Sequence, residues 1–309
     1  MHIGAHVSSS GGIHTAIDRI EQIGGDSVQV FTQSPRAWRP TNHDPATFER
    51  FKERRSEVGL QGVICHALYL VNLASPRDEF YEKSVAALQN TVEVGCAIEA
   101  DAVVFHVGSH LGAGLEEGVE RVVPALASVL DRCSETTWLC MENSAGAGGT
   151  IGRSLDELAL LLERLDRHPR LGVCLDSCHL YVSGYDVTDR PTLDRVLDEL
   201  DRTIGFDRLR CLHVNDAKTP LGSNRDRHDN VCDGLMGEGL GVFLGHPDLQ
   251  GLPAVLEVPG QDGHGPDANE VRKTKELHAR HAGAPTTRSG SRRKPGTSAR
   301  RRGARKTRG

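Results

Sequence analysis

The chain has 309 residues, of which 38% are hydrophobic and 26% are charged, and its formal net charge is −5. An α/β barrel commonly occupies about 250 residues, so one domain with an extension is the simplest interpretation. No segment is apolar over enough residues to span a membrane, and the N-terminus lacks the basic and apolar regions of a signal peptide. We therefore expect a cytoplasmic protein that does not contact membranes.

The charge is distributed unevenly along the chain. Residues 282–309 contain ten Lys or Arg and no acid, which leaves 27 basic and 42 acidic residues, a net charge of −15, in the remainder. A like-charged segment of low hydrophobicity buries too little apolar surface to offset its ordering entropy. We therefore expect a globular domain over residues 1–281 and a disordered basic tail over residues 282–309. The tail would bind nucleic acid non-specifically through its phosphates; the alternative is a solvated extension without an essential role.

Eight short apolar runs alternate with longer amphipathic stretches. The runs predict strands over residues 3–7, 28–32, 61–66, 102–106, 138–142, 172–176, 209–213 and 253–257. The stretches predict helices over residues 12–23, 45–58, 80–98, 118–133, 154–165 and 191–203. Ser154 followed by Glu157 is typical of a helix N-terminus. Because parallel strands buried on both faces are apolar throughout and need crossover helices, the pattern predicts a (β/α)8 TIM barrel with its active site at the C-terminal ends of the strands.

An open, doubly wound sheet is the structural alternative to this barrel. Many such sheets carry a Gly-x-Gly-x-x-Gly loop after the first strand, and the segment after residues 3–7 has no such loop. The Ser8-Ser-Ser-Gly-Gly12 stretch resembles a phosphate-binding loop only weakly, and we interpret it as the start of a helix.

Four of the eight cysteines lie inside the apolar runs, namely Cys65, Cys140, Cys174 and Cys211. A thiol in this setting behaves as a small buried hydrophobic group, and a chain of this size does not need disulfides for stability. We therefore expect buried free thiols. Cys178 and Cys232 differ because they lie near the proposed site, where metal-linked or oxidative chemistry stays an open alternative.

Six of the predicted strands end in residue types that bind metal ions. These residues are His66, His106, Glu142, Asp176, His213 and Glu257. Three further candidates follow in the adjoining loops, namely His179, Asp226 and His228. Strand ends of a barrel converge on one face, so side chains that are distant in sequence become neighbours there. Zinc usually takes four ligands, so nine candidates exceed the need of one ion and, with bridging carboxylates, could hold three.

Eight segments resemble the signature blocks of the endonuclease IV family of apurinic/apyrimidinic endonucleases, in order and at the family's spacing over roughly residues 1–281. They are Gly4-Ala-His-Val-Ser8, Phe105-His-Val-Gly-Ser-His110, Glu142-Asn-Ser-Ala-Gly146, Val173-Cys-Leu-Asp-Ser-Cys-His179, Gly184-Tyr-Asp186, His213-Val-Asn-Asp-Ala-Lys218, Asp226-Arg-His228 and Gly237-Glu-Gly-Leu-Gly241. The resemblance implies a zinc-dependent enzyme of base excision DNA repair. Such enzymes cleave the DNA backbone 5′ to an abasic site and leave a 3′-hydroxyl and a 5′-deoxyribose phosphate.

Carried over to this sequence, the resemblance implies three zinc ions per chain, with Glu142 as a catalytic residue that bridges two of them. The implied ligand sets are His66, His106 and Glu142; Glu142, Asp176, His213 and Glu257; and His179, Asp226 and His228. The implied chemistry is metal-assisted hydrolysis of a phosphodiester without an essential Ser or Cys nucleophile. The expected partner is double-stranded DNA containing abasic sites, and we expect the enzyme to be a monomer.

An abasic site lacks a base, so a protein cannot recognise it through hydrogen bonds to that base. Members of the family turn the abasic nucleotide out of the duplex and insert loop side chains into the gap. By resemblance, Arg36, Tyr69 and Leu70 are the candidates for DNA binding. The alternative is that Tyr69 and Leu70 only pack their loop and that Arg36 is a solvated base.

Two features depart from some members of the family. Ala67 and Leu68 occupy positions that can be polar in other members, and residues 230–236 resemble an insertion. Both segments are expected in loops that face the substrate, so they bear on lesion preference.

Two other functions compete with the nuclease interpretation. A divalent-metal sugar isomerase or epimerase on the same barrel would also use His, Glu and Asp at strand ends. It needs only one or two metal ions, so His179, Asp226 and His228 would be superfluous. A non-enzymatic DNA-binding or scaffold protein is supported only by the basic tail, and it has no use for nine metal ligands.

Overall fold

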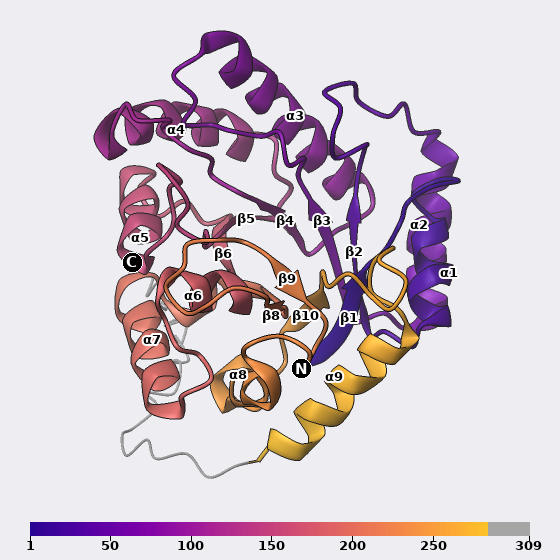
Figure 1. Cartoon of the computed structure of the whole chain (residues 1–309). Helices are drawn as coiled ribbons and strands as arrows, with labels where there is room; N and C mark the ends of the chain where they lie inside the picture. Colours follow the sequence, from indigo (N-terminus) through magenta and orange to yellow (C-terminus); the bar gives the residue numbers. More distant parts are fainter. Residues whose placement is uncertain (284–309) are drawn as a thin grey trace, which may run out of the picture.

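The computed structural model describes residues 1–283, so most of the predicted tail lies outside the described residues. Eight parallel strands form a closed barrel in the order β1-β10-β7-β6-β5-β4-β3-β2, with helices around it (Figure 1). The strands are β1 (His2–His6), β2 (Ser27–Phe31), β3 (Gly62–His66), β4 (Ala102–Phe105), β5 (Trp138–Glu142), β6 (Leu171–Asp176), β7 (Leu209–His213) and β10 (Pro253–Leu256). The predicted (β/α)8 barrel is confirmed, and the open sheet is excluded.

Most of the barrel's helices follow the amphipathic stretches of the sequence. The helices between or after the barrel strands are α1 (Thr15–Gln22), α2 (Pro45–Val58), α3 (Asp78–Ala97), α4 (Leu115–Leu130), α5 (Leu155–Arg164), α7 (Arg190–Thr203) and α9 (Ala268–His281). The Ser154 side chain caps α5 by accepting a hydrogen bond from the Glu157 amide. The Glu157 carboxylate binds the amides of Gly152 and Arg153 instead of the Ser154 amide, so it anchors the preceding loop. Among the described residues, none of these helices has the length and apolarity that a membrane crossing requires.

Four short elements lie in the loops at the C-terminal ends of β6 and β7. They are α6 (Ser177–Ser183), α8 (Leu240–Leu244) and the hairpin strands β8 (Asp216–Ala217) and β9 (His228–Asp229). Asp216 fixes the hairpin because its carboxylate accepts hydrogen bonds from the amides of Ala217, Gly234, Met236 and Gly237. Asp216 thus ties β8 to the segment that follows β9, and the Lys218 amide donates to the Arg227 carbonyl oxygen to close the loop that carries Asp226.

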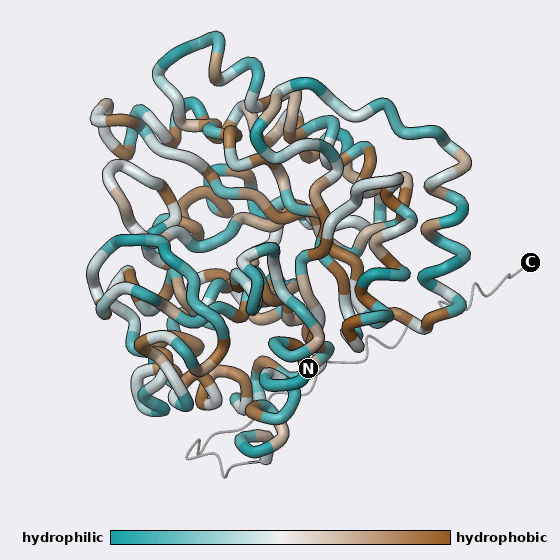
Figure 2. Tube along the Cα trace, turned by 45° about the vertical axis from the view of Figure 1, so that its right-hand side comes forward, coloured by the Kyte–Doolittle hydropathy of each residue, from teal (hydrophilic) through white to brown (hydrophobic). Residues whose placement is uncertain are grey.

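The apolar residues form two clusters. The larger cluster fills the space between the strands and the helices, and Figure 2 shows hydrophobic stretches of the chain in the interior of the molecule. The smaller cluster comprises Ile64, Ala102, Val104, Cys140, Cys174, Cys211 and Val255. Each cysteine of this cluster lies two residues before Glu142, Asp176 or His213, so it shares the inner face of its strand with that residue. The predicted buried free thiols are confirmed; Cys140, Cys174 and Cys211 lie in the inner cluster below the strand ends, whereas Cys65 belongs to the larger cluster.

The first strand approaches its neighbour so closely that one position requires glycine. A Cβ atom on Gly4 would lie 1.7 Å from the Ser27 carbonyl oxygen in β2. We predict that Gly4→Ala lowers the free energy of unfolding by about 3 kcal/mol or more, because backbone must move to relieve the overlap. Urea denaturation measures this loss. Gly251→Ala serves as the control, since its Cβ meets no atom within 4 Å and adds only the cost of a φ of +80°, about 1 kcal/mol.

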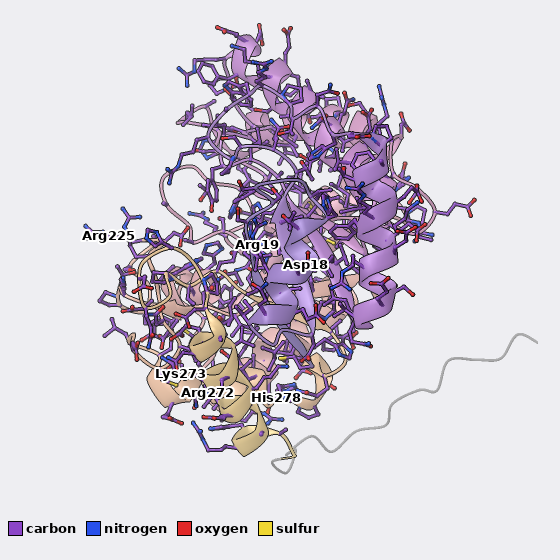
Figure 3. All side chains as sticks on the ribbon, turned by 90° about the vertical axis from the view of Figure 1, so that its right-hand side faces the viewer. Asp18, Arg19, Arg225, Arg272, Lys273 and His278 are labelled. Atoms are coloured by element: carbon purple, nitrogen blue, oxygen red, sulfur yellow. The ribbon has the colours of Figure 1, made fainter. Side chains whose placement is uncertain are left out.

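Helix α9 returns the chain to the N-terminal end of the barrel. His278 on α9 lies 2.8 Å from the Gln250 side-chain oxygen, to which the Met1 amino group also donates at 3.3 Å. Met1 and Gln250 precede β1 and β10, so α9 ends opposite the strand ends that carry the candidate ligands. Figure 3 shows His278 on α9 and Arg225 projecting from the loop beside Asp226.

Candidate metal centre

The C-terminal mouth of the barrel brings all nine candidate ligands together. Each belongs to at least one group whose ligand atoms lie within 4.8 Å of one another. These groups are Glu142, Asp176, His213 and Glu257; His179, Asp226 and His228; His66, Glu142 and His213; His106, Glu142 and His179; and Asp176 and His228 together with the Cys178 thiol. Positions from residue 66 to residue 257 thus meet at one place, because parallel strands all end at the same face.

Glu142 lies at the centre of this cluster and is fully buried. One carboxylate oxygen, Oε2, lies 3.2 Å from His66 Nε2 and 3.6 Å from His106 Nε2. The other, Oε1, lies 3.0 Å from His213 Nδ1 and 3.2 Å from His179 Nδ1. Burial raises the pKa of Glu142, but the imidazoles of His106 and His213 outweigh it and hold this pKa well below its usual value. The carboxylate is therefore ionised and can serve as a ligand on both oxygens.

The second group surrounds His213. Its Nδ1 lies 3.0 Å from Glu142 Oε1, 3.2 Å from Glu257 Oε2 and 3.9 Å from Asp176 Oδ2. Burial lowers the pKa of His213, but the negative charges of Glu257 and Glu142 raise it to about 10. Three carboxylates around one imidazole create a strong demand for positive charge, which a proton meets here and which a divalent cation meets better.

The third group, His179, Asp226 and His228, shows most clearly that the residues fit a metal ion. His179 Nε2 and His228 Nε2 lie 3.2 and 3.0 Å from the two oxygens of Asp226. Both nitrogens are buried, yet neither makes a hydrogen bond to any described residue. Buried polar atoms normally have partners, so two ring nitrogens that converge on one carboxylate without hydrogen-bond alignment are suited to bind a cation. The donor set of two imidazoles and a carboxylate fits zinc well.

Backbone carbonyls orient two of the histidines. His66 Nδ1 lies 2.7 Å from the Ala67 carbonyl oxygen, and His179 Nδ1 lies 2.9 Å from the Asn143 carbonyl oxygen. In each pair the ring N–H donates, which leaves Nε2 unprotonated and turned toward the centre.

Four polar residues of the mouth escaped the sequence analysis. His6 ends β1 and lies 3.7 Å from Glu257, and Gln29 in β2 reaches both Glu257 and His213. Asn143 accepts a hydrogen bond from the Asp176 amide, and Asn215 donates to the Asp176 carboxylate at 2.6 Å. The available signal was polarity on the inner face of an apolar run, which Gln29 shows between Val28 and Val30.

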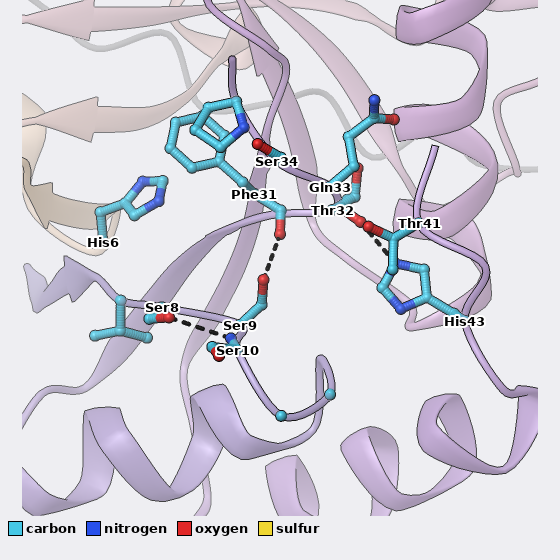
Figure 4. A pocket seen from close by; sticks show the side chains of 14 residues that line it. His6, Ser8, Ser9, Ser10, Phe31, Thr32, Gln33, Ser34, Thr41 and His43 are labelled. Atoms are coloured by element: carbon cyan, nitrogen blue, oxygen red, sulfur yellow. Dashed lines mark hydrogen bonds between the residues drawn. The ribbon is translucent and has the colours of Figure 1, made fainter. Parts of the chain in front are cut away.

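The candidate metal centre opens into a cavity of about 280 Å³, lined by His66, Tyr69, His106, His179, Asp226, Arg227, His228 and Glu257. A second cavity of about 370 Å³ lies between the loops after β1 and β2 (Figure 4). The two cavities are neighbours, since the Phe31 ring, which lines the second cavity, lies 5.1 Å from the Tyr69 ring, which lines the first. Arg19 donates to the carbonyl oxygens of Ser8 and Ser10, so the loop that borders this cavity is held from behind. The Ser8–Gly12 stretch thus borders a cavity before α1 begins.

The structure separates the predicted DNA-binding residues by exposure. Tyr69 is 59% exposed at the edge of the metal cavity, and Arg36 is exposed on the neighbouring loop, whereas Leu70 is half-buried against the core. Burial and the charges of Glu257 and Glu142 raise the pKa of the Tyr69 hydroxyl to about 12, so the phenol is neutral.

The two segments in which the sequence departs from some family members behave differently. Ala67 and Leu68 are buried and pack into the core, whereas Tyr69 of the same loop is exposed and lines the cavity at the mouth. Residues 230–236 begin at Asn230, whose side chain donates to the Gly260 carbonyl oxygen, and they end in the amides that bind Asp216.

Comparisons with known proteins agree on the family. Residues 17–280 match the family model of the xylose isomerase-like TIM barrel. The probable endonuclease 4 of Halothermothrix orenii is 37% identical over 88% of this chain and 98% of that protein. The probable endonuclease 4 of Thermotoga maritima is 35% identical over 89% and 96%.

Solved structures separate the two enzyme alternatives. The crystal structure of endonuclease IV from Thermus thermophilus has a TM-score of 0.80 and 35% identity, with 91% of this chain and 100% of that chain covered. A D-psicose 3-epimerase has a TM-score of 0.65 over 92% of this chain and 100% of that chain, but only 13% identity. The likeness to the epimerase is therefore a likeness of fold alone.

Proposed function

Because this chain belongs to the endonuclease IV family of deoxyribonucleases, we propose that it cleaves double-stranded DNA on the 5′ side of abasic sites during base excision repair. The products are a 3′-hydroxyl and a 5′-deoxyribose phosphate. The observation that carries this proposal is the group of His179, Asp226 and His228, whose buried ring nitrogens converge without hydrogen-bond partners among the described residues. A sugar isomerase with one or two metal ions has no use for this group.

The nine ligands are proposed to hold three zinc ions. One ion is held by His66, His106 and Glu142, the second by Glu142, Asp176, His213 and Glu257, and the third by His179, Asp226 and His228. The first set is supported by the approach of two imidazoles to the same Glu142 oxygen. Five imidazoles among nine ligands favour zinc over magnesium or calcium, which prefer oxygen.

When bound, divalent cations of this kind stabilise charge on phosphate oxygens and lower the pKa of water. The side chains of the centre would bind and position these cations. Glu142 stays ionised and connects two of the ligand sets, so the sets keep a fixed separation. Arg227 lines the cavity and adds positive charge for the phosphate. Burial raises the pKa of the Cys178 thiol, which makes it unsuited to act as a nucleophile.

Incision of a defined duplex tests this function. A duplex with a single abasic-site analogue is expected to be cut once, 5′ to the lesion, while the undamaged duplex stays intact. His179→Ala is expected to abolish the cut, and His278→Ala, which changes a histidine at the opposite end of the barrel, is expected to keep it. Epimerisation of a ketohexose in the presence of manganese, with no cut of the abasic duplex, would instead support the sugar isomerase.

Arg36, Tyr69 and Leu70 are proposed to fill the gap that the missing base leaves. The exposure of Tyr69 beside the metal cavity supports this role. We predict that Tyr69→Ala raises the KM for abasic duplex about 10- to 100-fold, because stacking of an aromatic ring on a base contributes about 1–3 kcal/mol. Tyr69→Phe keeps the ring and is expected to retain most of the affinity. Steady-state kinetics on abasic duplex compares the two variants, and equal KM values would contradict the role.

The basic tail is proposed to add non-specific affinity for DNA. Each phosphate neutralised by Lys or Arg contributes about 0.9 to the slope of log K against log salt. Removal of residues 282–309, which contain ten such residues, is therefore expected to lower this slope by several units on undamaged duplex. Fluorescence anisotropy at several salt concentrations measures the slope. An unchanged slope would show that the tail is a solvated extension.

The monomeric state and the cytoplasmic location stay predictions.

A further inference from the structure

Gln29 is a polar side chain in the barrel interior to which the proposed function gives no role. It lies in β2, between Val28 and Val30, and it is fully buried. Its strand pairs with β1 and β3, yet its side chain reaches a residue that follows β10 and one that ends β7, two and three strands away around the barrel. A buried amide in an apolar run is costly unless each of its polar atoms has a partner.

All polar atoms of this amide have partners in the metal centre. Gln29 Oε1 lies 2.8 Å from His213 Nε2, and Gln29 Nε2 lies 2.6 Å from Glu257 Oε1. The same amide nitrogen lies 3.0 Å from His6 Nδ1. One acceptor and two N–H donors are therefore used together by an imidazole, a carboxylate and a second imidazole.

The donor and acceptor roles in these contacts determine which ring nitrogen of His213 carries the proton. The amide oxygen can only accept, so His213 carries a proton on Nε2. Its Nδ1 then faces Glu142 and Glu257, which is the side on which the ligand atoms gather. Gln29 also occupies Oε1 of Glu257, so the other oxygen, Oε2, is the one that remains toward His213 Nδ1.

We propose that Gln29 is a positioning residue, which fixes the ring orientation and tautomer of His213 and the rotamer of Glu257 so that both present one ligand atom to the second metal ion. This inference rests on the proposed three-ion centre and deepens it. An outer partner that holds a ligating histidine typically changes metal affinity about 10- to 100-fold when it is removed.

Two substitutions distinguish a positioning role of Gln29 from a role in packing alone. Gln29→Met keeps the length of the side chain but leaves His213 Nε2–H and Glu257 Oε1 without their partner. Gln29→Glu keeps the acceptor but places a second carboxylate where the amide donated to Glu257, so the two negative charges repel each other. Gln250→Met is the matched control, because the Gln250 amide also pairs with a histidine Nε2 but lies at the opposite end of the barrel.

The experiment measures metal content and zinc affinity of the purified full chain by competition with a chromogenic chelator. Both Gln29 variants are expected to bind one zinc ion about 10- to 100-fold more weakly and to keep the other ions. Gln250→Met is expected to bind all ions as the unmodified chain does. Full metal loading of folded Gln29→Met with unchanged affinity overturns the proposal.

A second measurement does not depend on any variant. In the metal-loaded full chain labelled with ¹⁵N-histidine, His213 is expected to show a slowly exchanging proton on Nε2 and none on Nδ1. A proton on Nδ1 overturns the proposal. If the unmodified chain binds no divalent zinc at all, the proposed function falls together with this inference. If the unmodified chain binds zinc and the Gln29 variants bind it equally tightly, only this inference is overturned.

Discussion

Glu142→Gln is expected to lower single-turnover incision of abasic duplex by at least about 1,000-fold. Four imidazoles face this carboxylate at 3.0 to 3.6 Å, and it belongs to two of the proposed ligand sets. The amide keeps the shape of the side chain but removes its negative charge and one acceptor, so the two metal ions proposed to share Glu142 would lose this ligand. Removal of a charged group from a catalytic metal centre costs several kcal/mol of transition-state stabilisation. The metal content is expected to fall with the activity.

Glu157→Gln is the matched control for this prediction. Glu157 is also a buried glutamate after β5, but its carboxylate accepts hydrogen bonds from the Gly152 and Arg153 amides, away from the metal centre. The control is expected to keep its metal ions and its activity. A Glu142→Gln protein with full metal content and normal incision would exclude a bridging role.

Removal of the metal ions is expected to abolish incision and to lower the melting temperature by about 10 °C. A ligand present at about 1,000 times its Kd stabilises the folded state by about 4 kcal/mol, and 1 kcal/mol corresponds to about 2–4 °C in a domain of this size. Without cations, the charges of Glu257 and Glu142 raise the pKa of His213 to about 10, so protons take the place of the ions. Calorimetry before and after dialysis against a chelator measures the shift.

Adding a single metal ion back to the chelated protein distinguishes zinc from magnesium. Zinc is expected to restore both incision and melting temperature, whereas magnesium is expected to restore neither, because imidazole nitrogen is a poor ligand for magnesium. A chelated chain that melts and cuts as before would show that the cluster is not a metal centre. The Glu142→Gln protein is expected to lose less melting temperature on chelation, since it has fewer ions to lose.

The sequence was sufficient for the barrel and for the convergence of the ligands. Each predicted strand is present to within a few residues, although β4 ends at Phe105 and β10 ends at Leu256, one residue before His106 and Glu257. These shifts do not move the ligands from the mouth, because strand ends in a parallel barrel all open to one face. Runs of buried residues and the chemistry of side chains at their ends are local signals that one chain shows directly.

Contacts that depend on distant pairing could not be predicted. Gln29 meets Glu257 and His213 only because the barrel closes, and nothing near residue 29 announces those partners. The hairpin β8–β9 is similarly determined by Asp216, whose carboxylate binds amides up to 21 residues away. Leu68 is buried directly beside the exposed Tyr69, a difference that the sequence alone does not show.

The course of α9 decides where the tail leaves the folded domain. His278 contacts Gln250 and lies beside Met1, so the chain departs from the back of the barrel while the cut is made at the front. The basic tail, for which non-specific DNA binding is proposed, is therefore attached at the end of the barrel opposite the candidate metal ligands.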